Sequence, residues 1–213
     1  MFPAWVDKLN RLAIALVIGG LVYLVVLVLA ATSPGTQLTG YQPQQPVPYS
    51  HALHAGELGI DCRYCHVGVE TGAAATLPAT EICMNCHHSI RKDSEKLLPV
   101  FESHATGLPV PWVRVHDLPE FAYFDHSAHV RRGIGCVSCH GRVDKMDESG
   151  VYQVEPLNMG WCLRCHREPE RHLRQRETVT QMDWRPADQL ELGRRLLSEY
   201  NINPSTDCST CHR

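Results

Sequence analysis

The chain has 213 residues and a formal net charge of -3, a length that suits one or two compact domains. No run of Lys and Arg and no alternation of basic and aromatic residues is present, which argues against a nucleic-acid-binding protein. Ten cysteines and thirteen histidines stand against only four Phe and four Trp. Much of the aliphatic content lies in one early stretch, so the rest of the chain needs something other than apolar side chains to fill its interior.

The first element in chain order is an uncharged, apolar run over residues 12–31. As a helix it would span roughly 30 Å, the thickness of a bilayer hydrocarbon core. A cleaved signal peptide usually has an apolar run of about 7–15 residues, so we expect an uncleaved signal anchor and not a leader or a buried core helix. Lys8 and Arg11 precede the run, and the first charge after it is Glu57. The positive-inside rule then predicts that residues 1–11 are cytoplasmic and that the remainder is periplasmic or otherwise extracytoplasmic.

The next segment, residues 32–48, is rich in Pro, Gln, Gly and Thr and is predicted to be an extended linker. An internal repeat follows it. The sequence YSHALH precedes the motif CRYCH in one copy, and FDHSAH precedes CVSCH in the other. Each copy is followed by a second Cys-x-x-Cys-His motif. The repeat predicts two modules with two motifs each, residues 49–90 and 124–170.

The two modules are joined by a connector, residues 91–123, in which we expect a short helix around Ser94–Ser103. The last segment, residues 171–213, contains the pattern PADQLELGRRLLSEY, which predicts a helix over Pro186–Tyr200 opened by its proline. One face of this helix is expected to carry Leu190, Gly193, Leu197 and Tyr200. A fifth Cys-x-x-Cys-His motif follows it. No strand pattern is evident, so the predicted fold class is mainly α with extensive loops, plus one N-terminal transmembrane helix.

All ten cysteines belong to the five Cys-x-x-Cys-His motifs. This motif is the attachment signature of c-type haem, in which two thiols bind the porphyrin and the histidine coordinates its iron. The cysteines predicted to attach haem are Cys62, Cys65, Cys83, Cys86, Cys136, Cys139, Cys162, Cys165, Cys208 and Cys211. The predicted proximal iron ligands are His66, His87, His140, His166 and His212. The chain is therefore expected to carry five covalently bound c-type haems, around which a multihaem cytochrome c domain is built.

Structural zinc and disulfide bonds are the alternative uses of paired cysteines. Five Cys-x-x-Cys pairs do not divide evenly into four-thiolate zinc sites. Neither alternative requires a histidine directly after each second cysteine. The predicted location outside the cytoplasm is also where c-type haem is attached, so the motifs favour haem.

Eight further histidines are available as sixth, distal iron ligands. Residues i and i+3 of a helix share a face, so the two rings of a His-x-x-His pair can reach two different irons. We expect the first histidine of each pair, His51 and His126, to bind the haem of the motif that follows. The second histidines, His54 and His129, are expected to bind haems elsewhere in the cluster.

The fifth distal ligand is open between two residues. His116, in the rigid stretch WVRVHDLPEF, is our expectation, and Met159, three residues before the fourth motif, is the alternative. A methionine ligand would raise that haem's potential relative to ligation by two histidines. Met146 and His172 are weaker candidates. His88 adjoins a motif histidine and is expected at the surface or behind a ligand.

His-x-x-His ahead of Cys-x-x-Cys-His resembles the class III multihaem cytochromes, the cytochrome c3 and c7 group. The membrane helix, the five motifs and the stretches PWVRVHDLPEFAYFDHSAHVRRGIGCVSCHGRV and LNMGWCLRCHREP are similar to the pentahaem cytochrome c subunit of alternative complex III. That resemblance implies a quinol-oxidising membrane complex. In it an iron–sulfur subunit receives electrons from quinol oxidised near a polytopic membrane subunit. The pentahaem subunit then passes them to a monohaem cytochrome c and on to a soluble carrier or an oxidase.

Three functions compete for this pattern. In an electron-transfer subunit of a respiratory or photosynthetic complex, six-coordinate haems leave no open iron site, so no catalytic site of its own is expected. A stand-alone membrane-anchored multihaem quinol dehydrogenase, usually of the tetrahaem type, fits five motifs and a duplicated His-x-x-His module less well. A haem reductase for nitrite or a similar substrate needs a vacant distal site. The electron-transfer subunit is therefore the predicted function.

Overall fold

The computed structural model describes residues 3–31 and 38–212 of the chain. The beginning of the predicted linker and the outermost residues at both termini lie outside the described part. The chain divides into two units, Met1–Thr39 and Gly40–Arg213.

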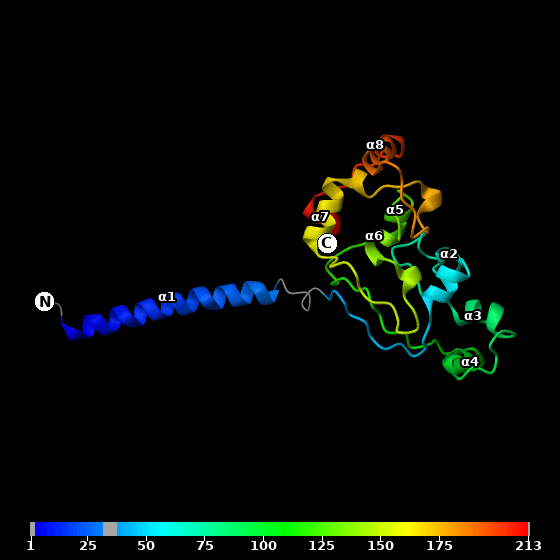
Figure 1. The fold of residues 1–213 in the computed structure, drawn as a ribbon, viewed down its shortest axis with the longest axis horizontal. Coiled ribbons are helices and arrows are strands. Elements are labelled where there is room, and N and C mark those ends of the chain that lie inside the picture. Colours follow the sequence, from blue (N-terminus) through cyan, green and yellow to red (C-terminus); the bar gives the residue numbers. More distant parts are fainter. Residues whose placement is uncertain (1–2, 32–37, 213) are drawn as a thin grey trace. The chain divides into compact units, whose positions relative to one another are not determined.

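The first unit is built on one long helix, α1, Ala4–Ala31 (Figure 1). It begins eight residues before the predicted apolar run and includes the charged residues Asp7, Lys8 and Arg11. Its large apolar side chains are exposed. An 18-residue window of Trp5–Ala31 has a mean hydropathy of 3.0, and by length and composition this helix could cross a membrane. The expected N-terminal apolar helix is present, as a candidate for a single membrane span.

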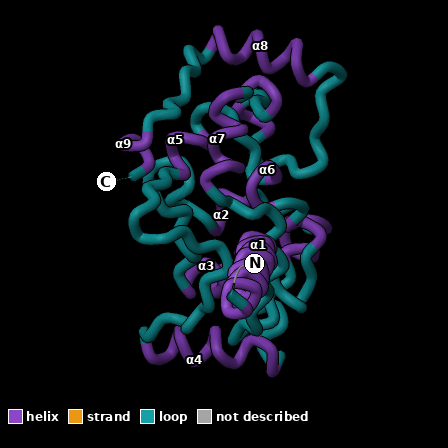
Figure 2. The backbone as a smooth tube through the Cα atoms, turned by 90° about the vertical axis from the view of Figure 1, so that its left-hand side faces the viewer, coloured by secondary structure: helices purple, strands orange, loops and turns teal. Residues whose placement is uncertain are grey.

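The second unit consists of short helices joined by long loops (Figure 2). Its α-helices are α2 (Cys62–Cys65), α3 (Thr80–His87), α4 (Leu98–Thr106), α5 (His126–Val130), α6 (Val137–His140), α7 (Met159–Arg167), α8 (Gln189–Glu199) and α9 (Cys208–Cys211). A π-helical segment, η1 (Ala52–Glu57), and four 3₁₀ turns, η2 (Glu95–Leu97), η3 (Val143–Lys145), η4 (Pro169–Arg171) and η5 (Arg176–Thr178), complete the described helices. The described residues form no strand beyond one antiparallel bridge between Ile134 and Leu173. This is the mainly α, loop-rich class that the sequence predicts.

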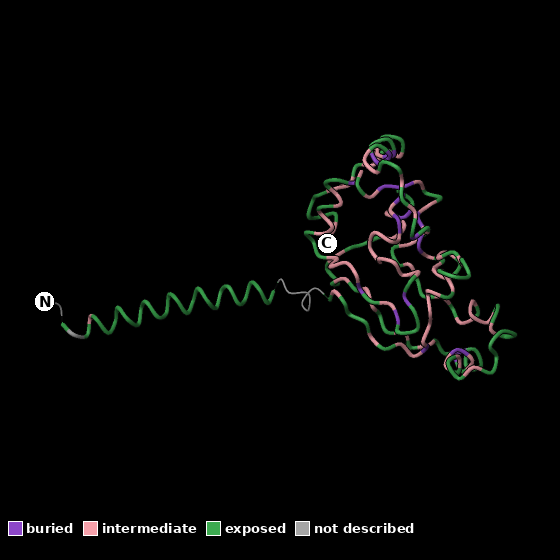
Figure 3. Tube along the Cα trace, in the orientation of Figure 1, coloured by how far each residue is buried: buried purple, intermediate pink, exposed green. Residues whose placement is uncertain are grey.

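The second unit has little apolar core of its own, and Figure 3 shows buried backbone only in short pieces. One buried cluster consists of Val69, Val130 and Val179, and another of Leu173, Leu192 and Leu196. A domain of this length ordinarily buries roughly 70% of the surface of its unfolded chain. Here several apolar side chains in or beside the motifs and His pairs are exposed, namely Leu53, Tyr64, Val67, Tyr123 and Met159. The unit is therefore shaped to pack against something besides its own side chains.

Helix α8 begins three residues later than predicted, because Asp188 and not Pro186 sets its start. The carboxylate of Asp188 accepts a hydrogen bond from the backbone amide of Glu191 at 2.9 Å. Such an N-cap satisfies an amide that no preceding carbonyl of the helix can reach. The predicted face is present in part, since Gly193 is buried and Leu197 and Tyr200 pack against the core cluster, whereas Leu190 is only half-buried. The buried residues of α8 are Leu192, Gly193 and Leu196.

Helix α8 packs directly on the backbone of η4. A Cβ atom added to Gly193 would lie 1.9 Å from the carbonyl oxygen of Glu170, so only glycine fits at this crossing. The side chain of Gln189 donates hydrogen bonds to the carbonyls of Glu170 and Leu173, at 3.0 and 2.8 Å. Figures 1 and 2 both show α8 at one end of this unit and α4 at the other, with the motif helices α2 and α6 between them.

Candidate haem sites

Each Cys-x-x-Cys pair of the five motifs lies on a turn of helix. The motifs occupy α2, the C-terminal half of α3, α6 together with the residue before it, the middle of α7, and α9. Helical spacing puts residues i and i+3 on one face, so the two thiols of each motif point to the same side and the histidine follows directly. None of the ten cysteines forms a disulfide bond.

Four of the motif imidazoles are held by a backbone carbonyl at Nδ1. The acceptors are Thr76 for His66 (2.7 Å), Ile90 for His87 (2.9 Å), Ser205 for His166 (2.7 Å) and Phe121 for His212 (3.1 Å). A carbonyl oxygen only accepts, so Nδ1 carries the proton in each ring. The lone pair is then on Nε2, which is the arrangement that prepares a histidine to bind a metal.

Three of the predicted distal histidines are held in the same way. Nδ1 donates to the carbonyl of Ser50 in His54 (2.8 Å), of Ala73 in His126 (2.8 Å) and of Asp125 in His129 (2.7 Å). The bond from His126 to Ala73 joins α5 to the loop that follows the first motif, 53 residues earlier in the chain. The Nε2 atoms of these three rings are thereby also available to a metal.

Three distal rings face motif rings across a gap of nearly constant width. The ring centroids are 6.2 Å apart for His54 and His87, 6.3 Å for His126 and His140, and 6.1 Å for His129 and His166. An imidazole nitrogen binds a metal at about 2 Å, and its ring centroid lies roughly 1.1–1.2 Å behind it, so two imidazoles on opposite sides of one iron have centroids about 6.2–6.4 Å apart. The gap in each pair therefore accommodates one iron.

The fourth predicted distal histidine, His51, lies beside the first motif. Burial, followed by the charges of His66 and His54, lowers the pKa of His51 to about 4. Its Nδ1 atom is buried and has no hydrogen-bond partner among the described residues. His140 is similar, since burial and then the neighbouring His116 and His126 lower its pKa to about 3. Both rings are therefore neutral near pH 7, which is the protonation state that coordinates metals.

Two aromatic residues that our sequence analysis did not single out hold the His-x-x-His pairs. The ring of Tyr49 stacks on His54 (4.4 Å, 22°) and meets His51 edge-on (4.7 Å, 82°). In the second copy, Phe124 stacks on His129 (4.5 Å, 29°) and meets His126 edge-on (4.8 Å, 84°). Their signal was present in the repeat, because each is the first residue of the hexapeptide that contains the pair.

His116 lies against the third motif. Its ring centroid is 4.4 Å from that of His140 at an interplanar angle of 81°, too close for an iron to lie between them. Burial and then the charge of His126 lower the pKa of His116, and its Nε2 atom is buried without a partner among the described residues. Met159, the alternative ligand, is the first residue of α7 and is 65% exposed.

The two weaker candidates, Met146 and His172, and the adjoining histidine His88 lie in three different settings. Met146 is buried, and its carbonyl accepts a hydrogen bond from the amide of Ala52 at 2.8 Å. His172 is half-buried and follows η4 directly. His88 is exposed, and its Nδ1 atom pairs with the carbonyl of Met84 at 2.9 Å.

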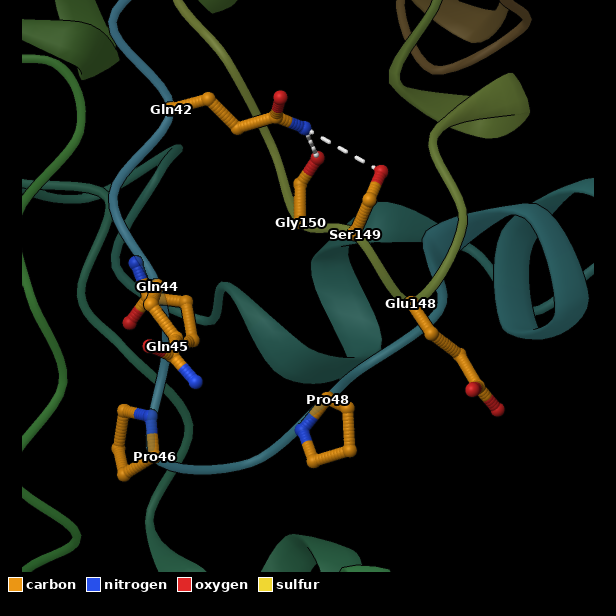
Figure 4. A pocket seen from close by; sticks show the side chains of 8 residues that line it. All are labelled: Gln42, Gln44, Gln45, Pro46, Pro48, Glu148, Ser149 and Gly150. Atoms are coloured by element: carbon orange, nitrogen blue, oxygen red, sulfur yellow. Dashed lines mark hydrogen bonds between the residues drawn. The ribbon is translucent and has the colours of Figure 1, made fainter.

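A pocket of about 490 Å³ lies between residues 42–48 of the predicted linker and the 148–150 loop (Figure 4). The side chain of Gln42 donates to the carbonyl of Gly150 at 2.8 Å and to the hydroxyl of Ser149 at 3.3 Å. None of the predicted haem residues lines this pocket. The two hydrogen bonds of Gln42 attach the start of the second unit to the 148–150 loop.

The donor groups fit c-type haem. Paired thiols stand beside histidines that are neutral or fixed in the metal-binding tautomer, and apolar side chains lie exposed near them where a porphyrin would cover them. Once bound, haem supplies a one-electron redox centre whose potential is set by its axial ligands and by its surroundings. The fold and the sites together define a c-type cytochrome domain that binds several haems.

Comparison with known proteins agrees with this class. A family model described as cytochrome c7 and related cytochrome c matches residues 122–213. The chain is 30% identical over 151 residues to the menaquinone reductase, multiheme cytochrome c subunit, of Nitratidesulfovibrio vulgaris (strain Hildenborough). That alignment covers 62% of this chain and 71% of the relative. The chain belongs to the multihaem cytochrome c family, and c-type haem is its covalently bound cofactor.

Proposed function

We propose that this chain is a membrane-anchored pentahaem cytochrome c that relays electrons within a quinol-linked membrane complex. The observation that carries the proposal is the set of three facing imidazole pairs, with centroids 6.1–6.3 Å apart. An iron with a histidine on each side has no free position for a substrate. Such a haem exchanges electrons with its neighbours and does not bind a small molecule.

In the proposed arrangement each of the five motifs attaches one haem. The axial pairs are His51 with His66, His54 with His87, His126 with His140, and His129 with His166. Anchored Nδ1 atoms keep the rings in place, and the stacked aromatic residues limit their rotation. Rings that stay in place favour electron transfer because little reorganisation accompanies the change of oxidation state.

For the fifth haem, at His212, we favour Met159 over His116. The ring of His116 is already in contact with His140, which faces His126. Met159 begins the helix that contains Cys162, and Cys162 lies close enough to Cys211 of the fifth motif to feel its charge. A thioether ligand would give this haem a higher potential than the four haems with two histidines, and so make it the electron sink of the chain.

The complex that we propose is alternative complex III or a close counterpart. The partners would be an iron–sulfur subunit, a polytopic quinol-binding subunit and a monohaem cytochrome c, with electrons passing on to a soluble carrier or an oxidase. The relative whose name includes menaquinone reductase supports a quinone-linked role. The helix α1 would anchor the chain with its N-terminus in the cytoplasm and the haem domain on the periplasmic side.

The second candidate is a stand-alone quinol dehydrogenase, which the quinone-linked relative also supports. The two functions differ in what the isolated chain does with quinol. The test is to purify the full-length chain in detergent, add a menaquinol analogue anaerobically and follow haem reduction by absorbance. A relay subunit stays oxidised until the other subunits of the complex are added. Rapid reduction of the isolated chain would contradict the relay function.

A further inference from the structure

Arg174 is a buried cation without a carboxylate partner. Only 6% of the residue is exposed, and it forms no ion pair with any described residue. One guanidinium nitrogen donates to the carbonyls of Thr178 (3.3 Å) and Gln181 (2.9 Å), and Nε has no acceptor among the described residues. Burial and then the charge of Arg185 lower the pKa of Arg174, and no carboxylate offsets them. A buried guanidinium without a counter-ion is costly and therefore uncommon.

The guanidinium group rests on the backbone next to the third motif. A Cβ atom at Gly135 would lie 2.4 Å from both Cζ and Nε of Arg174, so the absence of a side chain there makes room for the charge. Gly135 directly precedes Cys136. On another side, the ring of Trp184 covers the guanidinium, with Cζ 5.1 Å from the ring centroid.

Buried backbone and side chains exclude water from the contact between Arg174 and the third motif. The amide of Cys136 donates to the carbonyl of Val179 at 3.0 Å, and Val179 is fully buried. The amide of Arg174 donates to the carbonyl of Gly133 at 2.9 Å, next to the bridge between Ile134 and Leu173. Charges interact more strongly where water is excluded, because the effective dielectric constant is lower.

We propose that Arg174 is a positioned charge that raises the reduction potential of the haem attached at Cys136 and Cys139. The inference rests on the proposed haem at this motif. Reduction adds one negative charge to the haem, and a fixed positive charge nearby stabilises that product relative to the oxidised form. The thiols of Cys62 and Cys136 are hydrogen-bonded to each other, so a haem attached at the first motif would be the next to feel this charge, and more weakly.

The same residue also fastens the loop over residues 175–181, through its bonds to Thr178 and Gln181. Substitution by lysine distinguishes a purely structural role of Arg174 from an electrostatic one. Lysine keeps the charge and loses the fork of donors, so it preserves an electrostatic effect and weakens the loop. Midpoint potentials therefore separate the two roles where stability does not.

The test is a potentiometric titration of the full-length protein in detergent, for the wild type, R174Q, R174K and R185Q. Arg185 is exposed, follows Trp184 directly and contributes the same formal charge, so R185Q is the matched control. In R174Q one midpoint should fall by about 59 mV, a tenfold change in that haem's reduction equilibrium, and a second should fall by less. R174K should stay near the wild type, and R185Q should not differ from it.

An R174Q curve that overlays the wild type at full haem content would overturn the proposal, as would a fall in R174K as large as in R174Q. An equal shift of all five midpoints would also overturn it, because that result would reflect net charge alone. If R174Q takes up too little haem, G135A is measured in its place, because its Cβ atom displaces the guanidinium of Arg174. The same midpoint potential should fall in G135A, and an unchanged titration curve would contradict the proposal. Haem content and polypeptide mass report separately whether the third motif is loaded, which tests the proposed function on its own.

Discussion

At the scale of single residues, the chain prepares imidazoles for iron by fixing their other nitrogen. Seven of the predicted ligand rings donate Nδ1 to a backbone carbonyl, four from the motifs and three from the predicted distal set, and His88 does the same. Each of these Nδ1 atoms is held by the main chain, which a substitution of another side chain leaves in place. Mutations should therefore act on coordination through the ring that is removed, while the remaining rings stay in place.

Replacing His126 by alanine tests one facing pair. With its distal ligand absent, the haem at His140 should become five-coordinate and high-spin and should bind carbon monoxide, at one haem per chain. Absorption and electron paramagnetic resonance spectra of the ferric protein, with and without carbon monoxide in the ferrous state, measure this. His104 is exposed, so H104A is the control and should keep the wild-type spectrum. A wild-type spectrum for H126A would remove His126 from the ligand set.

The fifth distal ligand is tested by two matched variants, M159L and H116L. We expect M159L to abolish the ferric sulfur-to-iron charge-transfer band and to lower the highest of the five midpoints. H116L should preserve the band, because the ring of His116 contacts His140 and lies outside the pair that binds this iron. The reverse result, with the band kept in M159L and a high-spin haem in H116L, would assign the ligand to His116.

Asp61 gives the first motif a pH-dependent support. Its carboxylate accepts from the guanidinium and the backbone amide of Arg63 and from the hydroxyl of Thr180, and hydrogen bonding to the Arg63 side chain is the main reason that its pKa falls to about 2. The unfolded chain has an aspartate pKa of about 3.9, so Asp61 stabilises the fold above pH 4, and this contribution is lost as the pH falls toward 2. Thermal unfolding of D61N should show a lower melting temperature than the wild type at pH 7 and a much smaller difference at pH 2, where Asp61 is about half protonated. A difference of equal size at both pH values would speak against an ionised Asp61.

At the scale of elements, the second unit combines one-turn helices, on which several haem motifs lie, with a few helices of two to three turns. Helices of four or five residues are too short to persist alone, so α2, α5, α6 and α9 depend on tertiary contacts. Helix α8 is longer, with 11 residues, a side-chain N-cap and three buried residues on one face. It is the element where packing among the chain's own residues can be tested.

The contact between α8 and η4 depends on Gly193. In G193A the new methyl group would lie 1.9 Å from the carbonyl oxygen of Glu170, and the helix would have to move. We expect a loss of about 1–3 kcal/mol in the free energy of unfolding, the usual cost of overpacking. Denaturant unfolding followed by tryptophan fluorescence measures it. The control is G160A on α7, where the nearest atom is 3.5 Å from the added Cβ and no loss is expected; equal stability of both variants would contradict the close contact.

The sequence predicted these elements unevenly, and the reasons are physical. The sequence indicates the five motifs because haem attachment requires fixed residues at fixed spacing. It indicates the His pairs because they recur in the internal repeat. The start of α8 was placed at Pro186 because proline suits a first turn, but the aspartate two residues later makes the stronger cap. The repeat places Tyr49 and Phe124 at equivalent positions, but no sequence rule says that an aromatic residue there stacks on the histidines. The cover of Trp184 over Arg174 depends on loop geometry and could not have been predicted.

At the scale of the whole molecule, the chain combines an apolar helix with a domain that has little core of its own. The small clusters around Val179 and Leu196 are modest for a unit of this length. Covalent haems explain both the exposed apolar side chains near the motifs and the low content of regular structure. We therefore expect the fold of the second unit to depend on its haems.

The central claim is that five haems, each with two protein ligands, are attached to one chain. It is tested most directly on the purified full-length protein by combining the intact polypeptide mass with the ferric and ferrous spectra, the latter with and without carbon monoxide. We expect a mass increment of five haems and a low-spin spectrum that carbon monoxide leaves unchanged. Fewer than five haems per fully matured chain, or a haem fraction that binds carbon monoxide, would contradict it.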